Sequence, residues 1–94
     1  MDYEQYIKVP LAVITDKNLK PSTKVLFSLL IILVQQKGYC FAGNEYLAEK
    51  LNTSNRTISR LLKELSDVGY IKMEFKHKFQ RKIYIINSQK CYNF

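Results

Sequence analysis

The fold is decided by NEYLAEKLNTSNRTISRLLKELSDVG, residues 44–69. Apolar residues in its first half have the spacing of one helix face: Tyr46, Leu47, Ala48 and Leu51. Those in its second half fall at i, i+3, i+4 and i+7: Ile58, Leu61, Leu62 and Leu65. Asn44 and Ser54 are suitable N-caps, and Gly69 can end the second helix in a left-handed conformation. The stretch therefore predicts two short helices joined by a turn at Asn52-Thr53-Ser54.

After Gly69 the hydrophobic period changes from that of a helix to that of a strand. Apolar residues alternate with polar or charged neighbours on both sides of a charged centre: Ile71, Met73 and Phe75, then Ile83 and Ile85. This pattern predicts a β-hairpin over about residues 70–86. Its tip, from Lys76 to Lys82, holds four formal positive charges and no acid.

A longer helix is expected before this stretch, from Pro21 to Lys37. Proline fits the first position of a helix, and Gly38 fits the residue just past its end. The helix is apolar on almost every side between Val25 and Val34, which exceeds one amphipathic stripe. Two interpretations are compatible with this pattern and with each other: the helix runs through the middle of the domain, and one of its faces forms a homodimer interface. Three weaker signals flank it: a short edge strand within residues 3–10, a turn at 16–18 and a short strand at 39–42.

The length of the chain limits the number of domains, and its charge indicates the kind of partner. The chain has 94 residues, 47% of them hydrophobic, which allows one compact domain over residues 1–94. Its formal net charge is +7, a balance typical of proteins with polyanionic partners. Residues 1–43 carry five cations and three acids, whereas residues 44–94 carry ten cations and five acids. The positive excess therefore lies mostly in the half that holds the helix pair and the hairpin.

Several functional classes are disfavoured by what the sequence contains. Two cysteines and one histidine are too few ligands for a structural zinc site. The sequence has no glycine-rich phosphate loop and no histidine paired with a nucleophile, so we expect no catalysis, metal or cofactor. The longest apolar run is about half the length of a membrane-spanning helix. The N-terminus also lacks the features of a signal peptide, so we expect a cytoplasmic protein without a membrane partner.

The helix pair carries a family resemblance. Small Ala48 lies where the two helices must cross closely, and Leu65, Gly69-Tyr70-Ile71 and a basic hairpin follow. Over roughly residues 21–86 this combination resembles the winged helix-turn-helix family. The resemblance implies an α+β fold with three main helices, a C-terminal two-stranded wing and a short N-terminal strand. The helix-turn-helix would occupy about residues 44–68 and the wing about 70–86, with a possible dimerising helix at 21–37.

A second resemblance concerns the beginning of the chain. Ile7-Lys8-Val9-Pro10, Asp16, Leu19 and the long apolar helix look like the N-terminal winged-helix domains of plasmid replication initiators and phage replisome organisers. The same residues also resemble related plasmid-borne DNA-processing proteins. The resemblance implies an accessory role at an origin of plasmid or phage replication or of conjugative transfer, together with other replication or transfer proteins.

The second helix of the pair offers a candidate DNA-reading surface. Its polar residues lie opposite the apolar face or beside it, and with the cap they form one set: Ser54, Asn55, Arg56, Thr57, Ser59, Arg60 and Lys63. Arginine and asparagine can read guanine and adenine edges in the major groove, so Asn55, Arg56 and Arg60 are the expected base contacts. The hydroxyl groups of Ser54, Thr57 and Ser59 suit phosphate contacts.

The hairpin tip offers a second candidate surface for phosphate or minor-groove contacts. The expected contact residues are Lys76, His77, Lys78, Gln80, Arg81 and Lys82. Alternatives remain open at both surfaces. Arg60–Glu64 and Lys63–Asp67 have the i, i+4 spacing of ordinary surface ion pairs. The tip could equally be a solvated charged turn, and His77 a surface residue rather than a pH-dependent phosphate contact.

These patterns predict a sequence-specific double-stranded DNA-binding protein, acting as a homodimer across two half-sites. Two other functions stay open. One is a small winged-helix transcriptional repressor. The other is a protein-interaction module that uses the exposed apolar part of the helix at residues 21–37, although such a module would not need the charge asymmetry.

Overall fold

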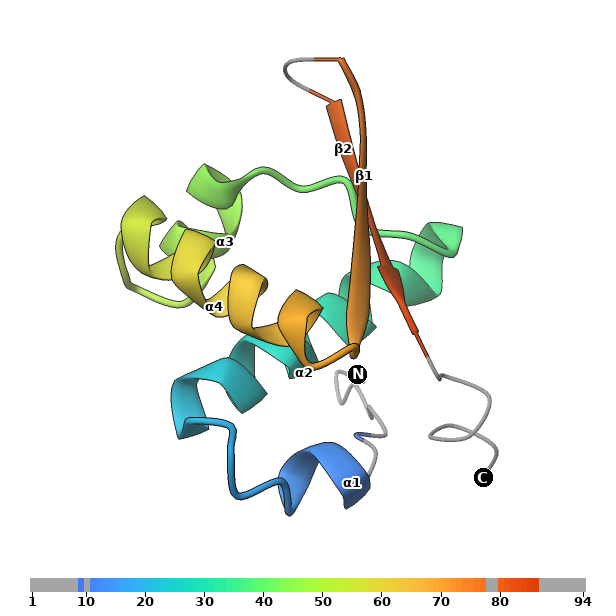
Figure 1. Ribbon diagram of the computed structural model, residues 1–94. Coiled ribbons are helices and arrows are strands. Elements are labelled where there is room, and N and C mark those ends of the chain that lie inside the picture. Colours follow the sequence, from blue (N-terminus) through green and yellow to red (C-terminus); the bar gives the residue numbers. More distant parts are fainter. Residues whose placement is uncertain (1–8, 10, 78–79, 87–94) are drawn as a thin grey trace, which may run out of the picture.

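The computed structural model describes residues 9, 11–77 and 80–86. Within these residues, four helices precede a two-stranded antiparallel hairpin (Figure 1). In chain order these elements are α1 (Leu11–Ile14), α2 (Pro21–Lys37), α3 (Asn44–Lys50), α4 (Asn55–Asp67), β1 (Ile71–His77) and β2 (Gln80–Ile85). The fold is the expected α+β winged helix. The edge strand expected within residues 3–10 falls outside the described residues, apart from Val9.

Helix α2 begins and ends where its sequence predicts. Pro21 occupies the first helical position, where its missing N–H costs nothing. Gly38 follows in a left-handed conformation, with φ of 87°, and donates its N–H to the Val34 carbonyl at 2.7 Å. Helix α2 is largely a central helix, since both α4 and β2 pack against it. Val25 is its most exposed large apolar side chain, at 53%.

The helix pair forms as expected, with one correction at its start. Ser54 caps α4 by accepting the Thr57 N–H at 3.1 Å. Asn44 is not the N-cap of α3: Gly43 holds that position, and Asn44 is the first helical residue. The Asn44 side chain bonds instead to residues distant in sequence. In the turn, Asn52 adopts a left-handed conformation with φ of 55°, a backbone geometry that asparagine tolerates better than most residues.

Two short segments differ from their predictions. Helix α1 was not expected, and it buries Val13 against the core. The strand expected at residues 39–42 is reduced to a single bridge, in which Cys40 pairs antiparallel with Ile83. The turn at residues 16–18 is present, with the Asn18 N–H bonded to the Asp16 carboxylate at 2.8 Å.

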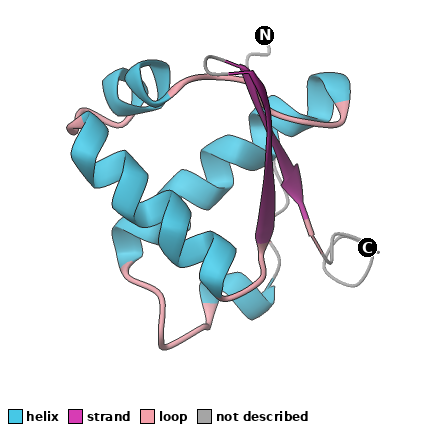
Figure 2. Cartoon of the chain, turned by 45° about the horizontal axis from the view of Figure 1, so that its top comes forward, coloured by secondary structure: helices cyan, strands magenta, loops and turns pink. Residues whose placement is uncertain are grey.

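The hairpin joins the helices through its base. Gly69, with φ of 89°, turns the chain out of α4, and Ile71 then pairs with Ile85. Ile71 and Ile83 are fully buried, whereas Phe75 is 66% exposed further along β1. In Figures 1 and 2 the strands cross over the C-terminal part of α2, with α4 beside them. The far end of the hairpin therefore extends away from the helices as a wing. Within the described part of the chain, no helix is long and apolar enough to cross a membrane.

Candidate nucleic-acid interface

Helix α4 divides cleanly into a buried and an exposed face. Its apolar residues are all buried: Ile58, Leu61, Leu62 and Leu65. The polar residues predicted to read DNA are exposed: Asn55, Arg56, Ser59, Arg60 and Lys63. Helices α2 and α3 and the base of the wing pack against α4, and these polar side chains remain exposed.

The two arginines of α4 are not held by ion pairs within the described residues. Glu64, the potential partner of Arg60, instead accepts a hydrogen bond from the buried Thr23 hydroxyl of α2 at 2.5 Å. Arg56 likewise has no hydrogen bond or ion pair among the described residues. Both guanidinium groups are therefore available to an external acceptor.

Lys63 forms the ordinary surface ion pair that its i, i+4 spacing from Asp67 allows. Its ammonium nitrogen lies 3.1 Å from the Asp67 carboxylate, and both side chains are mostly exposed. An exposed pair of this kind contributes little to stability and is easily exchanged for another anion. Lys63 can therefore exchange Asp67 for an external anion such as a phosphate.

The hydroxyl groups at the start of α4 have structural partners. Ser54 Oγ accepts the Thr57 N–H and donates to the Thr57 hydroxyl at 3.0 Å. The Ser59 hydroxyl accepts a hydrogen bond from the Asn44 amide at 2.9 Å. A phosphate contact by any of these groups would share or replace these bonds.

The predicted wing residues separate into different environments. Lys76 and Gln80 are exposed near the end of the hairpin. His77 is the last residue of β1, but its side chain lies outside the described part of the structure, as does the whole of Lys78. The Lys82 ammonium lies 4.6 Å from the centre of the Tyr39 ring, in a cation–π arrangement.

Arg81 is turned toward the body of the protein. It donates one hydrogen bond to the Asn44 amide oxygen and another to the Ala42 carbonyl, each at 2.7 Å. Burial lowers the pKa of its guanidinium below the ordinary value. Its Nε is buried and has no hydrogen-bond partner in the described structure. The strand pattern carried a signal for this orientation, because Arg81 shares a strand face with Ile83 and Ile85.

A chain of hydrogen bonds thus joins the wing to the exposed helix. It runs from Arg81 on β2 through the Asn44 side chain to Ser59 on α4. Sequence reasoning missed this role of Asn44, because the three residues are far apart in the chain. These hydrogen bonds hold the wing in a fixed position relative to the exposed face of α4. The wing and this face are the two surfaces predicted to contact DNA.

The described residues contain no cluster of three or more potential metal ligands. The one described cysteine, Cys40, is buried, and burial raises the pKa of its thiol above the ordinary value. A neutral buried thiol is a poor nucleophile and a poor ligand. The exposed groups on α4 and the wing are cationic or polar, and they can bind a ligand by charge and hydrogen bonding.

Comparisons with known proteins agree with this geometry. A family model described as a helix-turn-helix domain matches residues 17–71, more than half of the chain. A solved structure described as the N-terminal domain of a DNA binding protein is similar to the whole fold, with a TM-score of 0.69. That structure is 18% identical, and the match covers 89% of this chain and 76% of the other. Among the curated proteins no match was found.

Proposed function

Because the chain belongs to the family of helix-turn-helix domains matched over residues 17–71, we propose that it is a sequence-specific double-stranded DNA-binding protein. In this proposal α4 enters the major groove, and Asn55, Arg56 and Arg60 contact base edges. The wing contacts the backbone or minor groove beside it.

The observation that carries the proposal is the exposed polar face of α4. Arg56 and Arg60 lie on it without an ion-pair partner among the described residues, although acidic Glu64 is one turn from Arg60. An unpaired arginine retains its full capacity for bidentate contacts with guanine. Arg60 keeps this capacity because its neighbour Glu64 is bonded to Thr23 instead.

The wing adds cations at a fixed position relative to α4. Lys76 is exposed, and the bonds of Arg81 to Asn44 and Ala42 anchor β2 beside the start of α3. We propose that the wing contacts the DNA backbone through Lys76, His77, Lys78, Gln80 and Lys82. Arg81 instead positions the wing.

A binding titration tests the proposal at both surfaces. The affinity of the protein for a fluorescent duplex, measured by anisotropy, should fall as the salt concentration rises. The reason is that each phosphate contact releases counterions from the DNA. Lys76→Gln should weaken binding to every duplex and flatten the salt dependence. Arg56→Ala should weaken binding to the preferred duplex by about 1 to 3 kcal/mol and leave binding to unrelated duplexes nearly unchanged. Equal losses on all duplexes from Arg56→Ala would contradict its base-reading role.

The biological role we propose is accessory, marking an origin of plasmid or phage replication or conjugative transfer for other proteins. The resemblance of residues 7–37 to replication-initiator domains supports this role. The alternative function, a small transcriptional repressor, would place the DNA site at a promoter instead of an origin. Sequences retained from a random duplex library at about 150 mM salt should map as repeats near an origin. A motif that overlaps a promoter would instead favour a repressor, and the absence of any motif would favour a protein partner.

A further inference from the structure

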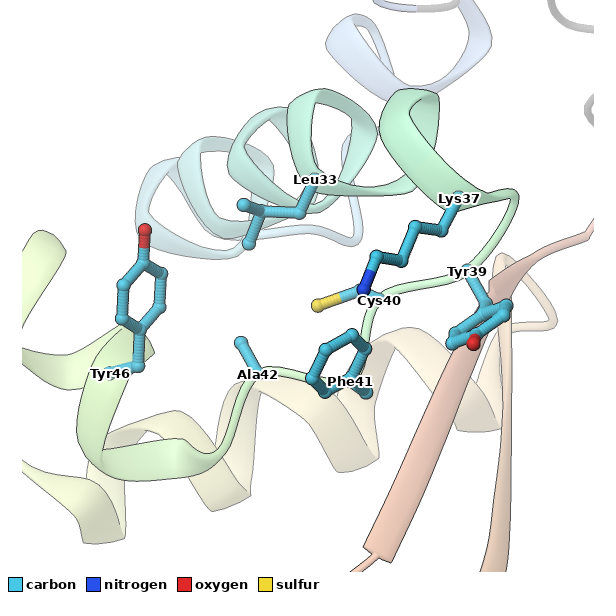
Figure 3. Close-up of a pocket in the computed structure, with 7 residues that line it drawn as sticks. All are labelled: Leu33, Lys37, Tyr39, Cys40, Phe41, Ala42 and Tyr46. Atoms are coloured by element: carbon cyan, nitrogen blue, oxygen red, sulfur yellow. The ribbon is translucent and has the colours of Figure 1, made fainter.

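A hollow lined by aromatic and basic side chains lies away from the exposed face of α4. It forms between the C-terminal end of α2, the loop at residues 38–43 and strand β2, and Figure 3 shows its apolar part. Two adjoining cavities of about 310 and 280 Å³ share Lys37, Tyr39 and Phe41. No residue of α4 lines either cavity, so the hollow is separate from the base-reading face proposed on α4, although its second cavity shares Lys76, Gln80 and Lys82 with the proposed wing contacts.

The aromatic side chains of the hollow form a connected group. The ring centres of Tyr39 and Phe41 are 6.1 Å apart, and those of Tyr39 and Tyr84 are 6.0 Å apart. Phe41 is 57% exposed, and in Figure 3 its ring projects from the loop beside Lys37. A phenylalanine this exposed has flat apolar surface available to a ligand, and its neighbours extend that surface.

Cations surround these rings. The Lys37 ammonium lies 4.4 Å from the Phe41 ring centre, and the Lys82 ammonium lies 4.6 Å from that of Tyr39. Lys76 and Arg81 also line the second cavity, and no acidic residue is among the described residues that line either one. The hollow is therefore complementary to a ligand that carries both flat rings and negative charge.

We propose that this hollow binds single-stranded DNA, with a base stacked on Phe41 and Tyr39 and the flanking phosphates near Lys37 and Lys82. A single strand has the required combination, because its unpaired bases expose flat faces beside anionic phosphates. Stacking would replace the weak exposed contact between each lysine and its ring, and the released ammonium group would turn to a phosphate. Such a surface would let the protein hold a separated strand next to its duplex site.

Other occupants fit the hollow less well. A duplex keeps its bases stacked on one another, so it would use the cations but not the rings. A second copy of the same surface would bring like charges together, which opposes a symmetric contact. A small aromatic anion would fill the apolar part but would leave the row of cations along the wing largely unused.

The test compares two single-stranded ligands of about 12 nucleotides, an oligothymidine and an abasic strand of the same length. Oligothymidine should bind at least about tenfold more tightly, since only it can stack on the rings. Phe41→Ala should remove most of that difference. Phe75→Ala is the matched control, because Phe75 is also exposed on the surface but lines neither cavity. Circular dichroism of both variants is the control for folding, and it should match that of the wild type.

This experiment separates the inference from the proposed function. Phe41→Ala should leave duplex affinity unchanged, and Arg56→Ala should leave oligothymidine affinity unchanged. Equal binding of the oligothymidine and abasic strands would overturn the inference, as would equal losses from Phe41→Ala and Phe75→Ala. Tight binding of free thymidine monophosphate, equal to that of the oligothymidine, would also overturn it in favour of a small-molecule site. None of these outcomes depends on whether the duplex is recognised.

Discussion

At the scale of single residues, Asp16 links the segment before α2 to the start of the wing. Its carboxylate accepts hydrogen bonds from the Asn18 N–H and from the Tyr70 hydroxyl, each at 2.8 Å. These bonds lower the pKa of Asp16 below its ordinary value of 3.8, the bond from Asn18 having the larger effect. The residue therefore favours folding when it is ionised.

This arrangement predicts the direction of a pH dependence. A carboxyl group with a lowered pKa in the folded state stabilises the protein above its ordinary pKa, and the benefit is lost as pH falls through the lowered value. The free energy of unfolding, measured by urea denaturation, should therefore decrease below about pH 4. Asp16→Asn should be less stable than wild type at neutral pH, and the two should converge in acid. A constant difference between them at every pH would contradict the assignment.

The cap of α4 is a second feature at this scale. Ser54→Ala removes the acceptor of the Thr57 N–H, and the free energy of unfolding should fall by about 1 kcal/mol. Ser22→Ala is the control, because Ser22 is exposed in the first turn of α2 and no cap bond is assigned to it. Equal effects of the two substitutions in urea denaturation would exclude Ser54 as a stabilising cap.

At the scale of elements, the wing is positioned by Arg81 and Asn44. The half-buried guanidinium group has its two bonds in the body of the protein, so loss of Asn44 leaves a buried charge with fewer partners. Asn44→Ala and Arg81→Ala should each destabilise the fold, and a double-mutant cycle should give a coupling of about 1 to 3 kcal/mol. A coupling near zero would show that the two side chains do not depend on each other.

The elements also separate what local sequence can predict from what it cannot. The bounds of α2, the Ser54 cap and the hairpin follow from neighbouring residues, and the structure agrees. Helix α1 is only four residues long, too short for a hydrophobic period to identify. Asn44 was wrongly predicted as an N-cap because its partners, Ser59 and Arg81, are brought close only by the tertiary fold.

The same limit applies to the candidate site. The exposed side of α4 was predictable because its apolar period fixes which residues face the core. The four-charge tip was not a uniform surface, because Arg81 shares the inward face of β2 with Ile83. The aromatic hollow could not be predicted from the sequence, because Tyr39, Phe41 and Tyr84 come together only when β2 pairs with the segment after α2.

At the scale of the whole molecule, oligomeric state decides how long a DNA site the protein covers. We propose a homodimer through the exposed apolar part of α2, where Val25 is the most exposed residue. Val25→Asp should then give a folded monomer by light scattering, with circular dichroism unchanged. Gln35→Asp, at an exposed polar position of the same helix, is the control and should remain dimeric. A wild-type protein that is monomeric at high concentration would end the dimer proposal.

The central claim is that the exposed face of α4 reads base sequence. Its most direct test is selection of duplexes from a random library, run in parallel with wild type and Arg56→Ala at about 150 mM salt. The account predicts an enriched motif for wild type, and for Arg56→Ala the same motif with preference lost at one or two adjacent positions. The same motif with undiminished preference for both proteins, or no motif for wild type, would contradict it.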